Sequence, residues 1–156
     1  MKCINYKTGG FIPAGTEVYR TKIIYDKQFS DSIYFKVADS KKEYKMRFNT
    51  MWHRGKTIEN YKDYLFTKKT FEQQVEGMSE KEIEAIKHGK IVVGMSKRAV
   101  LVSYGRPPEH RTPDLKSNRW RYWMNRIKQK TICFDKGLTV RCIDLKKHQE
   151  KLTDEL

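Results

Sequence analysis

One stretch just past the middle of the chain holds the strongest candidates for catalytic chemistry. Gly94-Met95-Ser96 is the beginning of a G-x-S-x-G nucleophile motif, but Arg98 stands where the second glycine belongs and no parallel-sheet pattern precedes it. Glu109, His110 and Asp114 offer carboxylates and an imidazole, the groups used in general acid–base catalysis. Neighbours in a proline-flanked loop are more often surface polar residues. The sequence therefore predicts a protein that is not an enzyme and has no catalytic residues.

The same conclusion holds for metal and cofactor sites. The four histidines, His53, His88, His110 and His148, stand singly and without the spacing of a metal site. The chain contains no H-E-x-x-H helix motif, no phosphate-binding loop and no dinucleotide fingerprint. We therefore expect no metal and no cofactor.

A second candidate is an anion site at Ser96, Lys97 and Arg98. Amides at the start of a helix, next to two cations, are able to hold a phosphate. The competing interpretation is that Ser96 is an ordinary N-cap, whose hydroxyl satisfies amides that lack a helical partner.

The third candidate is a basic strand with aromatic residues, "RWRYWMN". Alternation places Trp120 and Tyr122 on one face and Arg119, Arg121 and Trp123 on the other. Further cations accompany the second face, namely Arg141 and, in the adjoining hairpin, Arg126, Lys128 and Lys130. Such a face is able to stack single-stranded bases or to bind the phosphates and sugars of an envelope polymer. Alternatively, Trp123 packs against the N-terminal region and the arginines are a solvated rim.

The net charge favours an anionic partner. The 156 residues include 33 Lys and Arg against 19 Asp and Glu, which gives +14. Such a field attracts nucleic acid, an acidic lipid or glycan surface, or an acidic protein. No segment reaches the ~18 apolar residues of a membrane span. The N-terminus lacks the apolar core of a signal peptide, which leaves a cytoplasmic protein or an exported one whose leader was removed.

The pattern of elements predicts an α+β protein in two parts. Residues 1–66 read as a small β domain, a barrel or a curled sheet, and residues 67–78 as a linker. Residues 79–145 read as two helices followed by a three-stranded antiparallel meander, and residues 146–156 as a polar tail. Ser79 and Glu82 form a capping box for the first helix, while Ser96 and Gly105 bound the second.

Three cysteines, Cys3, Cys133 and Cys142, form no C-x-x-C motif. Placing Leu138, Val140 and Cys142 on the apolar face of the last strand directs Cys142 inward and Cys133 outward. Side chains on opposite faces of a sheet cannot be bridged. The sequence therefore predicts two free thiols in the final hairpin.

"GKIVVGMSKRAVLVSYGRPP" resembles the SmpA/OmlA (BamE-like) family of bacterial envelope lipoproteins. The resemblance rests on Gly94-Met95-Ser96, Val100 and Gly105-Arg106-Pro107, followed by "RWRYW" and "ICFDKGLTVRCI", and covers roughly residues 79–144. It implies a BLIP-like domain without catalysis that acts as an interaction or scaffold module of the envelope. The best-known members belong to the outer-membrane β-barrel assembly machinery and contact lipid. Cys3 follows Met1-Lys2 and not the small residues of a lipobox, and the N-terminal β region is additional.

We therefore expect a non-enzymatic adaptor or scaffold of the bacterial cell envelope. It would bind an envelope protein complex or an anionic lipid or glycan surface, in the periplasm or at the outer-membrane periphery if a leader was removed, and otherwise in the cytoplasm. The alternative is a nucleic-acid-binding module that uses the basic aromatic sheet face.

Overall fold

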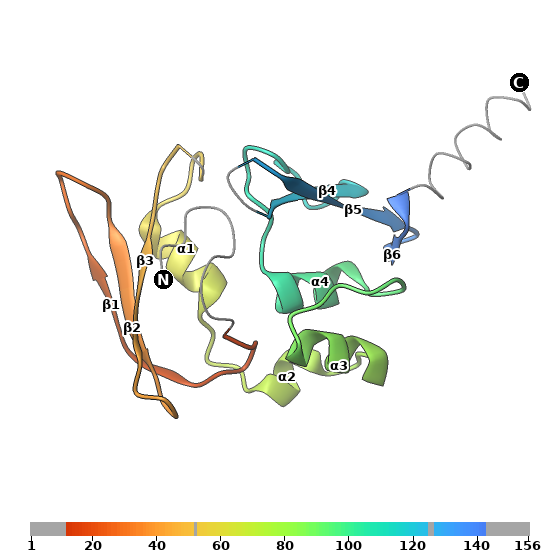
Figure 1. Cartoon of the computed structure of the whole chain (residues 1–156), viewed down its shortest axis with the longest axis horizontal. Coiled ribbons are helices and arrows are strands. Elements are labelled where there is room, and N and C mark those ends of the chain that lie inside the picture. The colour runs from red at the N-terminus through yellow and green to blue at the C-terminus, as the bar shows by residue number, and fades with distance from the viewer. Residues whose placement is uncertain (1–11, 52, 125–126, 143–156) are drawn as a thin grey trace, which may run out of the picture.

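The computed structural model describes residues 12–51, 53–124 and 127–142. These residues form two three-stranded antiparallel sheets and four helices (Figure 1), which confirms the α+β class. In chain order the elements are β1 (Val18–Ile24), β2 (Ser32–Val37), β3 (Glu43–Arg47), α1 (Ile58–Leu65), α2 (Phe71–Val75), α3 (Glu80–Lys87), α4 (Lys97–Tyr104), β4 (Arg119–Trp123), β5 (Gln129–Asp135) and β6 (Leu138–Val140).

The N-terminal sheet is open, so the expectation of a barrel is wrong for the described residues. Its order is β1-β2-β3, which leaves β1 and β3 as edges, and three strands are too few to close. Ile33, Phe35 and Val37 alternate along β2 and are buried, and they pack with Met46 and with α1. One face of this sheet therefore carries the core, and the other face points outward.

The C-terminal half follows the predicted order of helix, helix and meander. The three strands pair as β4-β5-β6, and α4 packs beside α3 below them (Figure 1). Trp120 and Phe134 point inward and are fully buried with Val100 of α4. The predicted caps are confirmed, because Ser79 and Ser96 accept hydrogen bonds from backbone amides three residues ahead. Gly105 ends α4 with a φ of 77°.

The segment predicted as a linker contains a packed helix. Thr70 and Gln73 form a capping box that starts α2, and Val75 at its end is buried in the C-terminal core. A Cβ at Gly15, whose φ is 82°, would lie 2.7 Å from the Cβ of Phe71. This close approach brings the start of the N-terminal half directly against α2.

The face of β6 is opposite to the predicted one. Thr139 is buried and Leu138 is exposed, because the Thr139 hydroxyl donates to the Val92 carbonyl at 2.6 Å and accepts from the Met95 amide at 2.8 Å. Two hydrogen bonds to the segment before α4 thus decide which face points inward, against the apolar pattern.

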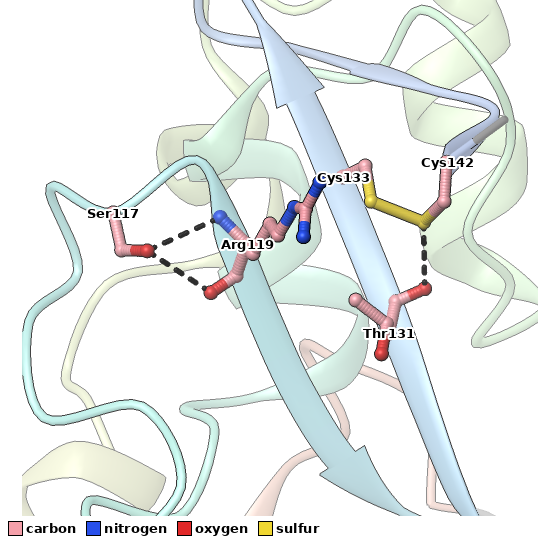
Figure 2. Close-up of a disulfide and its surroundings, with 5 residues drawn as sticks. All are labelled: Ser117, Arg119, Thr131, Cys133 and Cys142. Carbon is pink, nitrogen blue, oxygen red and sulfur yellow. Dashed lines mark hydrogen bonds between the residues drawn. A yellow bond between two sulfur atoms is a disulfide. The ribbon is translucent and has the colours of Figure 1, made fainter. Parts of the chain in front are cut away.

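This inversion overturns the prediction of two free thiols. Cys133 lies opposite Val140 in the pairing of β5 with β6. Cys142, two residues after Val140, therefore lies on the same outward side as Cys133, and their Cα atoms are 5.2 Å apart. The two cysteines form a disulfide, and the Cys142 sulfur also contacts the Thr131 carbonyl (Figure 2).

No helix among the described residues is long and apolar enough to cross a membrane. Cys3, Arg126, His148 and the tail at 146–156 lie outside the described residues.

Candidate functional site

The outward side of the C-terminal sheet carries two exposed arginines. Burial of Trp120 and Tyr122 on the inner face directs Arg119 and Arg121 to the outside of β4. Arg141 was expected on the same face, but it follows Val140, which pairs with Cys133, and alternation therefore puts it on the side of the buried Thr139. We call Arg119 and Arg121 the arginine face. Among the described residues neither of these guanidinium groups forms an ion pair with a carboxylate, so their charges are available to a partner.

The disulfide lies beside the arginine face. Arg119 pairs in register with Cys133, so its side chain lies beside the Cys133–Cys142 bond (Figure 2). The bond joins β5 to the residues after β6 and thereby links the strand next to Arg119 to the segment that bears Arg141. Lys128, before β5, is exposed, whereas Lys130 is half-buried with its ammonium 5.6 Å from the centre of the Tyr104 ring.

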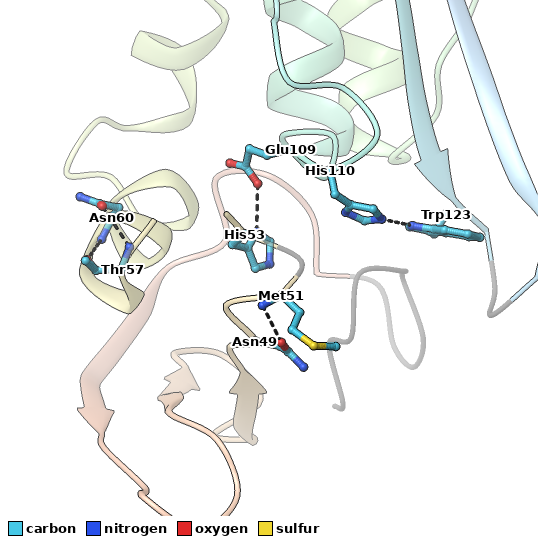
Figure 3. Close-up of polar contacts among 8 residues, drawn as sticks. All are labelled: Asn49, Met51, His53, Thr57, Asn60, Glu109, His110 and Trp123. Carbon is cyan, nitrogen blue, oxygen red and sulfur yellow. Dashed lines mark hydrogen bonds and ion pairs between the residues drawn. The ribbon is translucent and has the colours of Figure 1, made fainter. Parts of the chain in front are cut away.

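Trp123 is engaged by a neighbouring loop. Its indole N–H donates to Nε2 of His110 at 3.3 Å (Figure 3), and the guanidinium carbon of Arg111 lies 5.2 Å from its ring centre. Trp123 is half-buried, and it also lines the cleft that faces the N-terminal half. The ring is therefore part of a packed cluster and not an open stacking platform.

The three residues of the predicted anion site all have partners inside the chain. The Ser96 amide donates to the Glu82 carboxylate at 2.8 Å. The Lys97 ammonium donates to the carbonyls of three consecutive residues, Leu115, Lys116 and Ser117, at 2.8 to 3.3 Å. Arg98 donates to the carbonyls of Gln74 and Glu76. The helix start already holds an anion, the carboxylate of Glu82, which an external phosphate would have to displace.

Glu82 accepts hydrogen bonds from both helix starts. Its carboxylate also accepts from the amide and hydroxyl of Ser79, at 2.9 and 3.0 Å. Burial by itself raises the pKa of Glu82, but the hydrogen bonds from the backbone and side chains of Ser96 and Ser79 outweigh it and lower the pKa to about 2. Glu82 therefore fixes α3 and α4 to each other as an ionised group.

A cleft of about 1200 Å³ separates the two halves. Aromatic side chains from both halves line it, among them Tyr61 and Tyr64 of α1, Tyr104 of α4, and Tyr122 and Trp123 of β4. The guanidinium of Arg106 stacks 4.0 Å from the centre of the Tyr64 ring and connects the two walls. Burial raises the pKa of Tyr122, which stays a neutral donor to the Gly105 carbonyl at 2.8 Å.

The acidic and imidazole groups of the loop after α4 do not come together. Glu109 contacts Nδ1 of His53 across the cleft at 3.1 Å, while His110 faces Trp123 (Figure 3). Asp114 accepts from the Lys116 amide. The contact of His53 with Glu109 was missed by sequence reasoning, because 56 residues separate the two and neither belongs to a motif.

His53 contacts residues of both halves. Its ring stacks on Phe48 with centres 5.2 Å apart and contacts Tyr61 at 4.5 Å. Packing on one side and a carboxylate on the other give this histidine a structural role. Among the described residues, no group of three or more His, Cys, Asp or Glu side chains is arranged to hold a metal ion.

Comparison with models of known protein families, with curated proteins and with solved structures finds no match to this chain.

Proposed function

We propose that this chain is a non-enzymatic adaptor of the bacterial cell envelope, and that its arginine face binds an acidic surface of a partner protein. The observation that carries the proposal is the arginine face itself. Two exposed guanidinium groups, without carboxylate partners among the described residues, lie on β4 beside a disulfide that ties β5 to the residues after β6. Arginine forks match carboxylates in a bidentate geometry, and a preorganised fork loses less entropy on binding.

The disulfide supports the proposed compartment. Disulfides persist in oxidising environments such as the bacterial periplasm and are rare in the cytoplasm, where thiols are kept reduced. Cys133 is buried and Cys142 half-buried, so the bond belongs to the structure of the sheet and is not an exposed redox pair. The disulfide therefore supports the periplasm or the periphery of the outer membrane as the proposed location.

The order of elements also supports kinship with the SmpA/OmlA family. α3, α4 and the meander β4-β5-β6 follow each other as the BLIP-like domain of that family requires. The residues that carry the resemblance have structural tasks, since Ser96 caps α4, Val100 is buried below the sheet and Gly105 ends the helix. A scaffold fold with these tasks needs no catalytic group.

Nucleic-acid binding is the second candidate, and the net charge of +14 favours it. Trp123 argues for the adaptor instead, because His110 and Arg111 already occupy the ring that would stack on bases. A titration with single-stranded DNA across a salt series separates the two candidates. Tight binding with a steep salt dependence, lost in Arg119→Glu with Arg121→Glu, would support the nucleic-acid function.

The adaptor is tested by photo-crosslinking in intact Gram-negative cells. A photoreactive amino acid at position 121 is compared with the same group at Lys87, an exposed position at the end of α3. We expect a discrete protein adduct from position 121 and none of that mass from position 87. Arg119→Glu should remove the adduct. The absence of any adduct specific to position 121 would contradict the proposal.

A further inference from the structure

The outward side of the N-terminal sheet is a second basic surface, and the expected sites did not include it. Residues directly opposite in an antiparallel sheet share a face. Lys22, Tyr34 and Lys45 pair in one row across β1, β2 and β3, and they lie opposite to the buried face of β2. Figure 1 shows α1 on the inner side of this sheet, so the other side is directed away from the C-terminal half.

Cations outnumber carboxylates on this surface. Four of them, Lys22, Lys36, Lys45 and Arg47, belong to the paired rows, and Arg20 and Lys41 join them at the ring of Tyr19. Glu43 is the carboxylate in the same rows, and it forms an ion pair with Lys36. The ammonium groups of Lys22 and Lys45 lie 5.9 and 5.1 Å from the centre of the Tyr34 ring. We call these six residues, with Tyr19 and Tyr34, the lysine face.

An apolar tip adjoins the lysine face. The loop between β1 and β2, at the left of Figure 1, carries Phe29, whose exposed fraction of 80% is the largest among the loop's apolar side chains. Ile24, 39% exposed at the end of β1, lies on the same side as Lys22. Tyr25 is 66% exposed, but its hydroxyl donates to the Glu59 carboxylate of α1 and it therefore belongs to the other side of the sheet. Phe29 thus forms an apolar tip next to the basic surface.

The loop is ordered by its own side chains. The Asp26 carboxylate accepts from the amides of Gln28 and Phe29 at 3.0 and 3.1 Å, and Asp31 accepts from the Asp26 amide at 2.9 Å. The two carboxylates of the loop are thus turned to backbone donors, and Phe29 is held in an exposed position by a defined turn.

We propose that the lysine face and the Phe29 tip dock this protein on an anionic lipid bilayer. Basic residues near the surface of such a membrane gain electrostatic energy from its headgroups, and aromatic side chains are favoured in the interfacial layer. The sheet presents several cations to headgroups at once, while the tip inserts an aromatic ring at its end. The tyrosines on the face already have cations over their rings, which suits an interface better than stacking of bases.

This inference goes beyond the proposed adaptor function and does not depend on it. The arginine face would bind a protein, whereas the lysine face would hold the molecule at a membrane. The two faces lie on different sheets, so each is altered without changing the other.

Vesicle co-sedimentation tests the proposal with the purified, oxidised full chain. Vesicles of pure phosphatidylcholine are compared with vesicles that contain phosphatidylglycerol. We expect binding to the anionic vesicles that weakens as salt rises, and little binding to the neutral ones. Lys22→Glu with Lys45→Glu should weaken binding at least tenfold. The control, Lys87→Glu with Lys90→Glu, changes the net charge by the same amount at exposed residues outside the sheet. It should weaken vesicle binding less than threefold.

The tip is tested separately. Phe29→Ser should weaken binding to anionic vesicles about fivefold and leave the salt dependence unchanged, because it removes apolar insertion and no charge. In Phe29→Trp, the fluorescence added by the new indole should shift to the blue on anionic vesicles. Matching thermal melts of the variants exclude misfolding as the cause.

Three results would overturn the proposal. The first is equal binding to neutral and anionic vesicles, and the second is equal loss in the lysine-face variant and its charge-matched control. The third is binding of a single-stranded oligonucleotide that is tighter than vesicle binding and lost in the same lysine-face variant, which would assign the face to nucleic acid. None of these results affects crosslinking at position 121, so failure of this inference is distinct from failure of the adaptor proposal.

Discussion

Among single residues, Glu82 has the most clearly defined electrostatic task. Its carboxylate accepts hydrogen bonds from Ser79 and Ser96, the caps of two successive helices, and its pKa is lowered to about 2. The ordinary pKa of a glutamate in an unfolded chain is about 4.3. A depressed folded-state pKa means that the stabilisation is complete above the unfolded pKa and is lost as pH falls toward the folded one.

The Glu82→Gln variant tests this assignment. We expect the variant to be less stable than the wild type at neutral pH. The difference in unfolding free energy should shrink between about pH 5 and pH 2, since the wild type loses the ionised carboxylate there. Denaturant unfolding of both proteins at a series of pH values measures this difference in unfolding free energy. Glu80→Gln, an exposed residue in the same helical turn, serves as the control. A difference that is independent of pH would show that Glu82 does not act through its charge.

The disulfide gives a second prediction for single residues. Cys142→Ser should lower the free energy of unfolding by about 2–4 kcal/mol, because the cross-link closes a loop in the unfolded chain. Thermal melts with and without reductant check this, and the reductant should have no effect on the variant. Mass spectrometry of the non-reduced protein should find Cys133 and Cys142 in one cross-linked fragment. Two alkylated thiols at these positions would contradict the assignment.

Among the elements, the strand β6 has its inward face determined by a polar side chain. Thr139 is 3% exposed and bonds both to the Val92 carbonyl and to the Met95 amide. Thr139→Val keeps the shape and the β-branch but removes both hydrogen bonds of the hydroxyl, so the Met95 amide and the Val92 carbonyl keep only their 3.4 Å bond to each other. Each intramolecular hydrogen bond contributes about 0.5–1.5 kcal/mol.

We therefore expect Thr139→Val to destabilise the protein by about 1–3 kcal/mol in denaturant unfolding, although valine suits strands better than threonine by its apolar character. Thr131→Val, on the exposed side of β5, is the matched control and should be nearly neutral. If Thr139→Val is as stable as the wild type, the hydroxyl does not set the register of β6.

Elements with local signals were predictable, and those that depend on distant partners were not. Local sequence signals mark both helices of the C-terminal half, namely the caps Ser79 and Ser96 and the helix end at Gly105. The sequence therefore predicts α3 and α4 correctly. The same type of signal, Thr70 with Gln73, marks the start of α2, but the pattern of elements predicted from the sequence assigns this segment to a linker. The face of β6 depends on Val92 and Met95, more than forty residues earlier, which no periodicity contains.

At the scale of the whole molecule, contacts among the described residues join the two halves. They include the close approach of Gly15 to Phe71, the contact of His53 with Glu109, and the stacking of Arg106 on Tyr64. Sequence reasoning does not predict them, because the two residues of each contact lie far apart in the chain and share no motif. Of the candidate site, sequence reasoning found the outward arginines of β4, because alternation alone determines their face.

The junction is tested by Arg106→Ala with Glu109→Gln. These changes remove the stacking on Tyr64 and the charge beside His53, and a cation–π contact at an exposed site contributes about 0.5–1 kcal/mol. We expect faster amide hydrogen exchange in α1 and unchanged exchange in α3. Arg106→Lys alone, which keeps the charge, should have the smaller effect. Equal exchange in all variants would mean that these contacts do not couple the halves.

The central claim is that the arginine face binds an acidic partner protein, and an affinity measurement tests it most directly. The protein captured at position 121 is purified, and its dissociation constant is measured for the wild type, for Arg119→Glu with Arg121→Glu, and for the control Lys87→Glu with Lys90→Glu. The account predicts at least a tenfold weaker complex for the arginine variant and less than a twofold change for the control, because the double variants change the net charge equally. Equal dissociation constants for the two double variants would contradict it.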